Sequence, residues 1–226
     1  MTDRELALRF MPHFYRDSRE PFPVEAVGYS VLRADGKSPS SPRQLCLRGK
    51  AALMLEYAVF FDFDIQHLYD LEHVFLYLDD AGKVVGAEAS FHGWFFNSMF
   101  PGSGLSWEEE THPIFYMQPG KHAMMPDPRL FYLYRELSDA CTTLCGSGGF
   151  LVDPMFREEL STDPELDRIV EEYIRKHFAF EPSMHFEPAP LEPARLMTWP
   201  ELRALIVRRM CRWSERLRQG EGERHG

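Results

Sequence analysis

Runs of hydrophobic positions predict β-strands in the first half of the chain, two of which form an antiparallel hairpin. Residues 53–63 are dense in aromatic and aliphatic side chains, and residues 72–78 are apolar on both faces after their first position. Residues 79–82 read Asp-Asp-Ala-Gly, the composition of a tight turn, and residues 83–91 return as the partner strand. Two further segments are expected to be extended, a strand or irregular stretch at 24–33 and a short strand at 114–117.

Towards the C-terminus, the hydrophobic positions recur with the period of an α-helix. Asp163 is placed to cap a helix that begins at Pro164 and carries Leu, Ile, Val and Tyr on one face. Thr198 and Glu201 have the spacing of a capping box and open a second amphipathic helix. A third helix is predicted over 129–144, where a glycine-rich run follows. The chain therefore passes from a strand-rich half to a helix-rich end.

The aromatic content indicates how these elements pack. The 226 residues include 18 Phe, 9 Tyr and 4 Trp, and large aromatics suit pleated, two-layered sheets better than slim helical bundles. We therefore expect a mainly β fold, a β-sandwich with added helices that are chiefly C-terminal, so that the chain is α+β by content. The expected organisation is a β-sandwich domain with helical insertions over 1–197, a C-terminal helix packed on it over 198–219, and a disordered tail over 220–226.

Charge and the N-terminal sequence bear on partners and location. The formal net charge of −10 at pH 7 opposes binding of nucleic acid, because phosphate backbones are repelled. The N-terminus lacks the apolar stretch of a signal peptide, and no apolar run is long enough to span a bilayer, so we expect a cytoplasmic protein without a transmembrane segment. Peripheral membrane contact stays open. The arginine-rich outer face of the helix at 198–219 could meet an anionic membrane or an acidic partner, or it could be solvated, which single amphipathic helices favour.

Carboxylates and imidazoles are concentrated at residues 62–73, where one expected strand leads into the next. Asp70 and Glu72 are two positions apart, so in an extended chain both project to one face, which continues as core-type residues. Two carboxylates at the edge of an apolar face raise the free energy of the folded protein unless a positive group pairs with them. No Lys or Arg occurs between Lys50 and Lys83. A bound cation is therefore the simplest compensation, with His67 as a ligand or as a hydrogen-bond donor to one.

The donor atoms of this set bear on the choice of metal. Oxygen-rich ligands favour Mg²⁺, Ca²⁺ or Mn²⁺, and an added imidazole shifts the preference away from Ca²⁺ towards Mn²⁺ or another transition metal. The alternative is a solvated acidic turn with His67 and His73 as bystanders. His92 and His122 each stand beside a glycine at an expected strand end, where functional loops gather. Each of them alone is more simply a hydrogen-bonded structural histidine.

Four short motifs occur in one order along the chain: His67-Leu-Tyr-Asp70-Leu-Glu72-His73-Val74, Ser90-Phe-His92-Gly93, His112-Pro113-Ile-Phe-Tyr116 and Gly120-Lys-His122-Ala123. With this order the chain resembles the superfamily of necrosis- and ethylene-inducing cytolysins. It is most similar to the related group of vacuolar protein sorting sixty-two proteins, whose motifs read H-x-x-D-W-E-H-V, S-x-H-G and G-x-H-A. The similarity covers roughly residues 8–125. The chain departs from the motif at Leu71, where the family has tryptophan.

The resemblance implies a β-sandwich with a divalent cation held in a pocket at one end. Carried over by position, the ligands are Asp64, His67, Asp70 and Glu72. The run from Tyr57 to Asp64 parallels the cytolysins' Y-S-W-Y-F-P-K-D and selects Asp64 over Asp62. The residues expected to line the same pocket are Asp62, His73, His92 and His122.

Three roles are compatible with such a site. In the first, the cation bridges the protein to an anionic or sugar headgroup, as the resemblance suggests. In the second, the protein is a metal-dependent hydrolase acting on a phospho- or acyl-ester, with Glu72, His92 or His122 as general base. In the third, the ion is structural and ties two strands and a loop together. Whether the protein is an enzyme is left open by the sequence.

Overall fold

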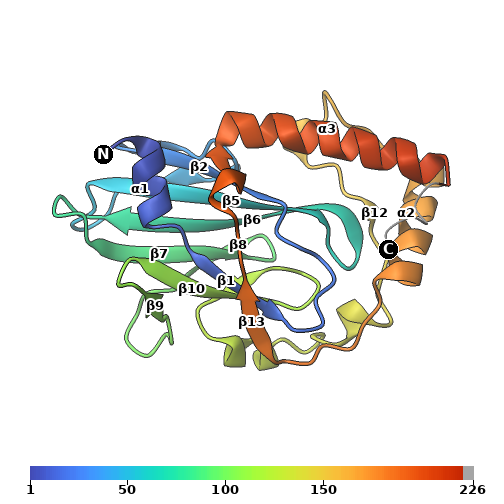
Figure 1. The fold of residues 1–226 in the computed structure, drawn as a ribbon, viewed down its shortest axis with the longest axis horizontal. Coiled ribbons are helices and arrows are strands. Elements are labelled where there is room, and N and C mark those ends of the chain that lie inside the picture. Colours follow the sequence, from blue (N-terminus) through green and yellow to red (C-terminus); the bar gives the residue numbers. More distant parts are fainter. Residues whose placement is uncertain (221–226) are drawn as a thin grey trace.

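Two β-sheets share one hydrophobic core in the computed structural model, which describes residues 1–220 (Figure 1). The larger sheet has the strand order β14-β2-β5-β6-β7-β8, with β12 beside β6, and the smaller has the order β11-β10-β1-β13, with β9 beside β10. The expected mainly β fold with added helices is confirmed. The strands are β1 (His13–Asp17), β2 (Ala26–Leu32), β3 (Gly36–Lys37), β4 (Gln44–Leu45), β5 (Leu53–Phe63), β6 (His67–Leu78), β7 (Val84–Phe91), β8 (Trp94–Asn97), β9 (Trp107–Glu108), β10 (His112–Met117), β11 (Met124–Met125), β12 (Gly149–Phe150), β13 (Phe186–Ala189) and β14 (Leu196–Thr198).

The predicted hairpin over 72–91 is formed by β6 and β7, and β5 pairs with β6 at the centre of the larger sheet. The β5–β6 register fixes which side chains face which way. Phe61 lies opposite Asp70 and Val59 opposite Glu72 in the antiparallel register. Because successive residues alternate between faces, this parity points Asp70 and Glu72 to the side of the core shared with the smaller sheet. We call that side the inner face. The opposite, outer face lies beneath α3 and the loop at 38–43.

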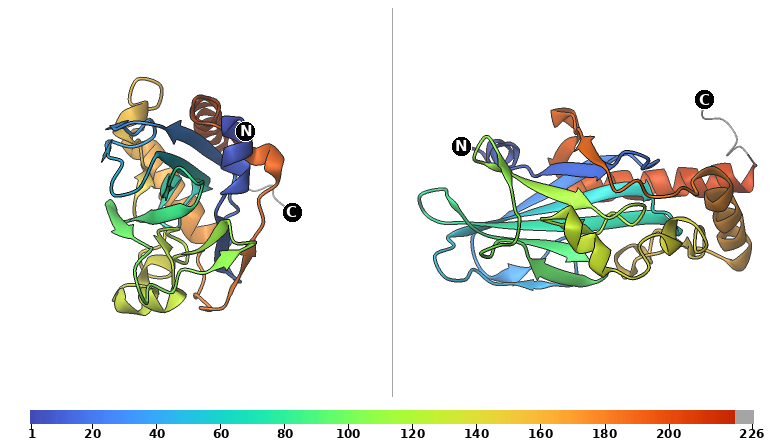
Figure 2. Two further views of the ribbon diagram at one scale, coloured as in Figure 1. Left: turned by 90° about the vertical axis from the view of Figure 1, so that its left-hand side faces the viewer. Right: turned by 90° about the horizontal axis from the view of Figure 1, so that it is seen from below.

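Three α-helices complete the fold: α1 (Asp3–Arg9), α2 (Pro164–His177) and α3 (Trp199–Arg218). The caps predicted for the last two are present, with Asp163 accepting from the Leu166 amide and a capping box between Thr198 and Glu201. In Figures 1 and 2, α3 runs along the long strands of the larger sheet and α2 stands at one end of them. Gly28 in β2 makes the close approach of α3 possible, because a Cβ there would lie 2.7 Å from Leu202 Cδ2.

The helix predicted over 129–144 is wrong. This segment forms two 3₁₀ turns, η1 (Pro128–Leu133) and η2 (Asp139–Cys141), separated where Tyr134 adopts an extended backbone. Its buried positions, 131, 140 and 141, do not follow a helical period, so no single helix would bury one stripe. The other 3₁₀ turns are η3 (Pro154–Phe156) and η4 (Pro193–Arg195).

The arginine-rich face of α3 is partly engaged by the chain itself. Arg203 pairs with Glu159 at 2.7 Å, Arg218 pairs with Asp163 at 2.5 Å, and the Arg216 guanidinium lies over the Trp213 ring. Within residues 1–220, no helix is both long and apolar enough to cross a bilayer. The division of the chain into a domain and an added helix stays a prediction, and the predicted tail at 220–226 lies outside the described residues except for Gly220.

Candidate functional site

The candidate site lies where the turn between β5 and β6 meets the loop between β10 and β11. The Ile65 amide donates to the Gly120 carbonyl at 2.7 Å, which ties the two segments together. The His122 ring stacks on Phe61, with ring centroids 3.8 Å apart and planes 7° apart. The loop between β10 and β11 thereby places Lys121 beside Asp64 and His122 beside Asp70.

Asp64 follows the last residue of β5 and is 1% exposed. It accepts backbone N–H groups from Gln66 at 2.6 Å and His67 at 2.8 Å, and the Lys121 ammonium binds its Oδ2 atom. Burial opposes ionisation, but the charges of His67 and Lys121 and the Lys121 hydrogen bond hold the pKa of Asp64 below its usual value. The carboxylate is therefore ionised at neutral pH.

His67 has a defined tautomer. Its Nδ1 lies 2.8 Å from the Tyr69 carbonyl oxygen, and because a carbonyl only accepts, Nδ1 carries the hydrogen. Its Nε2 lies 3.1 Å from Asp64 Oδ2. In the neutral ring Nε2 holds a lone pair, so two acceptor atoms face each other. This contact is favourable only if a proton or another cation is present.

Asp70 and Glu20 hold His122 between them. His122 Nδ1 donates to Asp70 Oδ2 at 2.8 Å, and Nε2 lies 3.6 Å from Glu20 Oε1, which is an ion pair too long for a hydrogen bond. Burial disfavours a charged ring, but these two carboxylates outweigh it and raise the pKa of His122 to about 10. His122 is therefore an imidazolium at neutral pH, held in a site that is 0% exposed.

Glu72 is the carboxylate that this arrangement compensates least. It is 9% exposed and accepts a hydrogen bond from the Ser90 hydroxyl. Burial and then the negative charge of Asp70 raise its pKa well above the usual value. Without a further positive charge nearby, Glu72 tends to hold a proton.

His92 borders the same group of charges. Its Nε2 lies 2.7 Å from Gln118 Oε1, and its ring stacks on Tyr134 with centroids 4.9 Å apart. Burial lowers the pKa of His92, with Lys121 lowering it further and Asp64 and Asp70 raising it. The charges of Lys121, Asp64 and Asp70 therefore act on the His92 ring.

Three residues of the site have a left-handed backbone, which non-glycine residues rarely adopt. Tyr69 has φ of 78°, His92 of 50° and His122 of 56°. Such conformations cost of order 1–3 kcal/mol each and are concentrated at functional sites. In β6, Tyr69 lies between the pairs Phe63–Leu68 and Phe61–Asp70, where the pairing with β5 is interrupted.

Two of the expected lining residues lie elsewhere. Asp62 projects to the outer face, where it accepts from Arg209 and from Trp213 Nε1 at 2.7 Å. His73 also projects to the outer face, where its Nε2 lies 3.0 Å from Ser40 Oγ. Burial lowers the pKa of His73 to about 4. The cause is strand alternation, since His73 is one residue out of phase with Asp70 and Glu72.

A bound cation was expected as the simplest compensation for the carboxylates, but Lys121 and His122 already bind two of them, Asp64 and Asp70. Lys121 and His122 come from a segment more than fifty residues further along the chain. Neither Lys121, which lies within the Gly120-Lys-His122-Ala123 motif, nor Glu20 is among the site residues predicted from the sequence. Across residues 1–220, no three His, Cys, Asp or Glu side chains are gathered so that they could hold a metal ion as they stand. The donor types fit a divalent cation, but Lys121 would have to leave Asp64.

Comparison with known proteins gives structural neighbours only. A scan against family models and a search of curated proteins each find no match. Among solved structures, the chain is similar to NLPPya in complex with glucosamine, with TM-score 0.35 and 16% identity over 53% of this chain and 64% of that one. It is also similar to NLPPya in complex with mannosamine, with TM-score 0.36 and 20% identity over 53% and 66%. A third match is Necrosis and Ethylene inducing Protein 2 from the causal agent of cocoa's Witches Broom disease, with TM-score 0.34 and 18% identity over 55% and 67%.

These neighbours are toxin-fold proteins of the necrosis- and ethylene-inducing group. The chain spans just under two thirds of the length of the first of them. At such TM-scores and identities, the overlap carries no ligand and no residue role over to this chain. The functional argument therefore rests on the side chains described above.

Proposed function

We propose that the protein binds a divalent cation through Asp64, His67, Asp70 and Glu72, and that the cation holds an anionic or sugar headgroup. Mg²⁺, Ca²⁺ and Mn²⁺ are the candidates, with the imidazole favouring Mn²⁺ over Ca²⁺. A bound cation would supply a positive charge with ligand positions open to oxygen atoms of the headgroup. The protein's residues would position it and exclude water on the core side.

The observation that carries this proposal is a charge imbalance. Four carboxylates are at most 9% exposed in one cluster: Glu20, Asp64, Asp70 and Glu72. Lys121 and the charged His122 offset two of these charges when His67 is neutral. Buried charges are stable only when they are paired. The remaining deficit equals the charge of one divalent cation, and the raised pKa of Glu72 is its expected consequence in the metal-free protein.

The His67 contact supports the same proposal independently. A metal-binding histidine usually donates its other ring N–H to a carbonyl or carboxylate, which fixes the tautomer. His67 has this arrangement, with Nδ1 on the Tyr69 carbonyl and Nε2 towards Asp64. A cation at that point would join the two facing atoms, with one coordination bond to His67 Nε2 and one to Asp64.

The hydrolase alternative has less support from the geometry. A general base needs a free lone pair near the reacting group. His122 is held as an imidazolium by Asp70 and Glu20, so it has no free lone pair, and Glu72 is assigned to the cation. A binding role requires neither residue to accept a proton. We also propose kinship with the vacuolar protein sorting sixty-two group, on the sequence motifs given above.

The test is cation binding by the purified protein and by the Asp70→Ala plus Glu72→Ala variant. Bound metal is measured after purification without chelator, and thermal stability is followed with Mg²⁺, Ca²⁺ and Mn²⁺. The control is Glu158→Ala plus Glu165→Ala, which removes two exposed carboxylates. Stabilisation of wild type and control, but not of the site variant, supports the proposal. Equal responses of all three proteins would remove it.

A further inference from the structure

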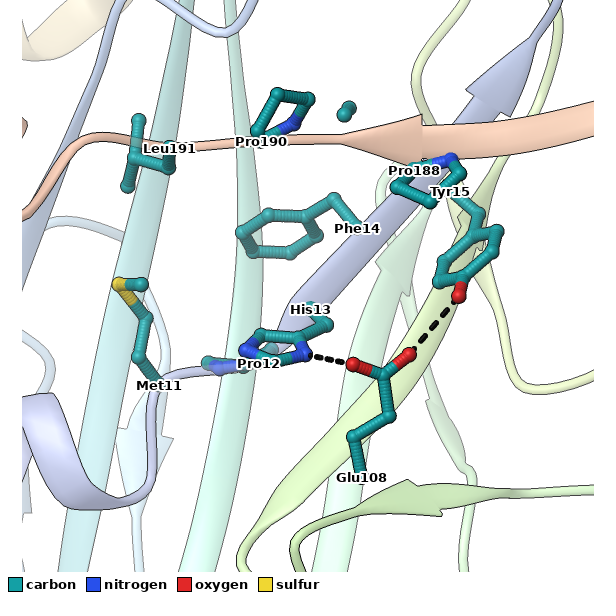
Figure 3. A pocket seen from close by; sticks show the side chains of 10 residues that line it. Met11, Pro12, His13, Phe14, Tyr15, Glu108, Pro188, Pro190 and Leu191 are labelled. Carbon is teal, nitrogen blue, oxygen red and sulfur yellow. Dashed lines mark hydrogen bonds and ion pairs between the residues drawn. The ribbon is translucent and has the colours of Figure 1, made fainter.

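A separate pocket lies on the smaller sheet, away from the carboxylate cluster. Its volume is about 270 Å³, and its ten lining residues come from β1 with the two residues before it, from the end of β13 with the two residues after it, and from β9. Figure 3 shows Met11 and Leu191 on one side of the pocket and Tyr15 with Glu108 on the other. At this volume the pocket suits a small ligand, since pockets for drug-sized ligands measure about 300–1,000 Å³.

The walls are apolar and poor in hydrogen-bond donors. Three of the lining residues are prolines (Pro12, Pro188 and Pro190), which have no backbone N–H. Both neighbours of β1 pair with it through the sheet ladder, so the backbone there is already occupied. Met11, Phe14 and Leu191 supply the remaining apolar surface.

The polar end of the pocket is built around Glu108. His13 Nδ1 donates to Glu108 Oε2 at 2.6 Å, and the Tyr15 hydroxyl donates to Oε1 at 2.8 Å (Figure 3). These hydrogen bonds, from Tyr15 first and His13 second, lower the pKa of Glu108. The carboxylate is held in one orientation, and each oxygen keeps a second lone pair.

The stacked imidazoles fix which polar atoms are acceptors. The His13 ring lies on the His112 ring with centroids 4.5 Å apart and planes 8° apart. His112 Nδ1 donates to the Met11 carbonyl at 2.8 Å, which anchors the stack. Because His13 gives its Nδ1 hydrogen to Glu108, its Nε2 is an acceptor in the neutral ring. The donors of His13 and Tyr15 are thus both committed to Glu108.

We propose that this pocket binds a small organic ammonium compound, a primary or secondary amine on a compact apolar body. The pocket presents oriented acceptors and one formal negative charge, and no lysine or arginine is among its lining residues. A cationic donor group satisfies the free lone pairs of Glu108 through charge-assisted hydrogen bonds. The apolar body fills the space between the prolines, Phe14 and Leu191. The proposal is independent of any metal at the carboxylate cluster.

The test compares benzylammonium chloride with neutral benzyl alcohol, titrated into the full-length protein by NMR or calorimetry. Wild type is expected to bind benzylammonium at least tenfold more tightly than the alcohol. Glu108→Gln keeps the shape but removes the charge, and it should weaken benzylammonium binding at least tenfold. Tyr15→Phe, which loses one orienting hydrogen bond, should weaken it less.

Glu110→Gln is the matched control, because it removes the same charge two residues away from an exposed position outside the pocket. It should bind as wild type does. The proposal is overturned if wild type shows no saturable binding, or if Glu108→Gln binds benzylammonium as tightly as Glu110→Gln. An unchanged circular dichroism spectrum establishes that each variant is folded.

Discussion

Lys121→Met tests the charge pair at the centre of the candidate site. The Lys121 side chain is 12% exposed and that of Asp64 is 1% exposed, so removing the ammonium leaves a buried carboxylate without its ion-pair partner. Breaking a buried pair in this way costs about 3–5 kcal/mol. Two backbone N–H groups and His67 still face Asp64, so we expect the low end, about 3 kcal/mol. For a chain of this length that corresponds to a fall in Tm of roughly 6–12 °C.

Thermal unfolding without and with Mn²⁺ measures both parts of this prediction. In chelator the variant should be destabilised by that amount, whereas Lys83→Met, at an exposed hairpin position, should stay within about 0.5 kcal/mol of wild type. Added Mn²⁺ should stabilise Lys121→Met more than wild type, because the cation no longer competes with an ammonium for Asp64. If Lys121→Met unfolds like Lys83→Met in chelator, the account of this pair is refuted.

Two further predictions concern the pH dependence and the packing. The charged His122 ring contributes stability that is complete below the unfolded pKa of about 6.5 and is lost as pH rises through its folded pKa of about 10. Urea unfolding at a series of pH values should therefore show the free energy of unfolding of wild type falling across this window. His122→Gln should show a smaller fall. An equal slope in both proteins would contradict the assignment of a charged His122. Gly28→Ala places a methyl group against Leu202 and should cost about 1–3 kcal/mol, seen as a lower urea midpoint. A midpoint equal to that of wild type would contradict the close packing of α3 on β2.

Local patterns were sufficient to predict the hairpin and the helix caps. The β6–β7 hairpin, its turn at 79–82 and the starts of α2 and α3 depend on neighbouring residues, so hydrophobic pattern, turn composition and capping chemistry predict them. The failed helix at 129–144 shows the limit of this reasoning. Its helix-forming residues have no stripe to bury, and the surrounding packing holds it in short 3₁₀ turns instead.

The candidate site was predicted only in part, because its charge balance is set by tertiary contacts. Strand parity placed Asp70 and Glu72 on one face, and the same rule, applied to Asp62 and His73, would have placed both on the outer face. Lys121 and Glu20 reach the cluster from distant segments, so no local spacing in the sequence predicts that they contact it. Glu108 belongs to a site that the sequence motifs did not mark.

The most direct test of the cation site is the anomalous scattering of crystals grown or soaked with Mn²⁺. The account predicts a single anomalous peak among the side-chain oxygens of Asp64, Asp70 and Glu72 and the Nε2 of His67, with the Lys121 ammonium moved off Asp64. A crystal in Mn²⁺ with no peak at this cluster, and with Lys121 still bound to Asp64, would contradict it.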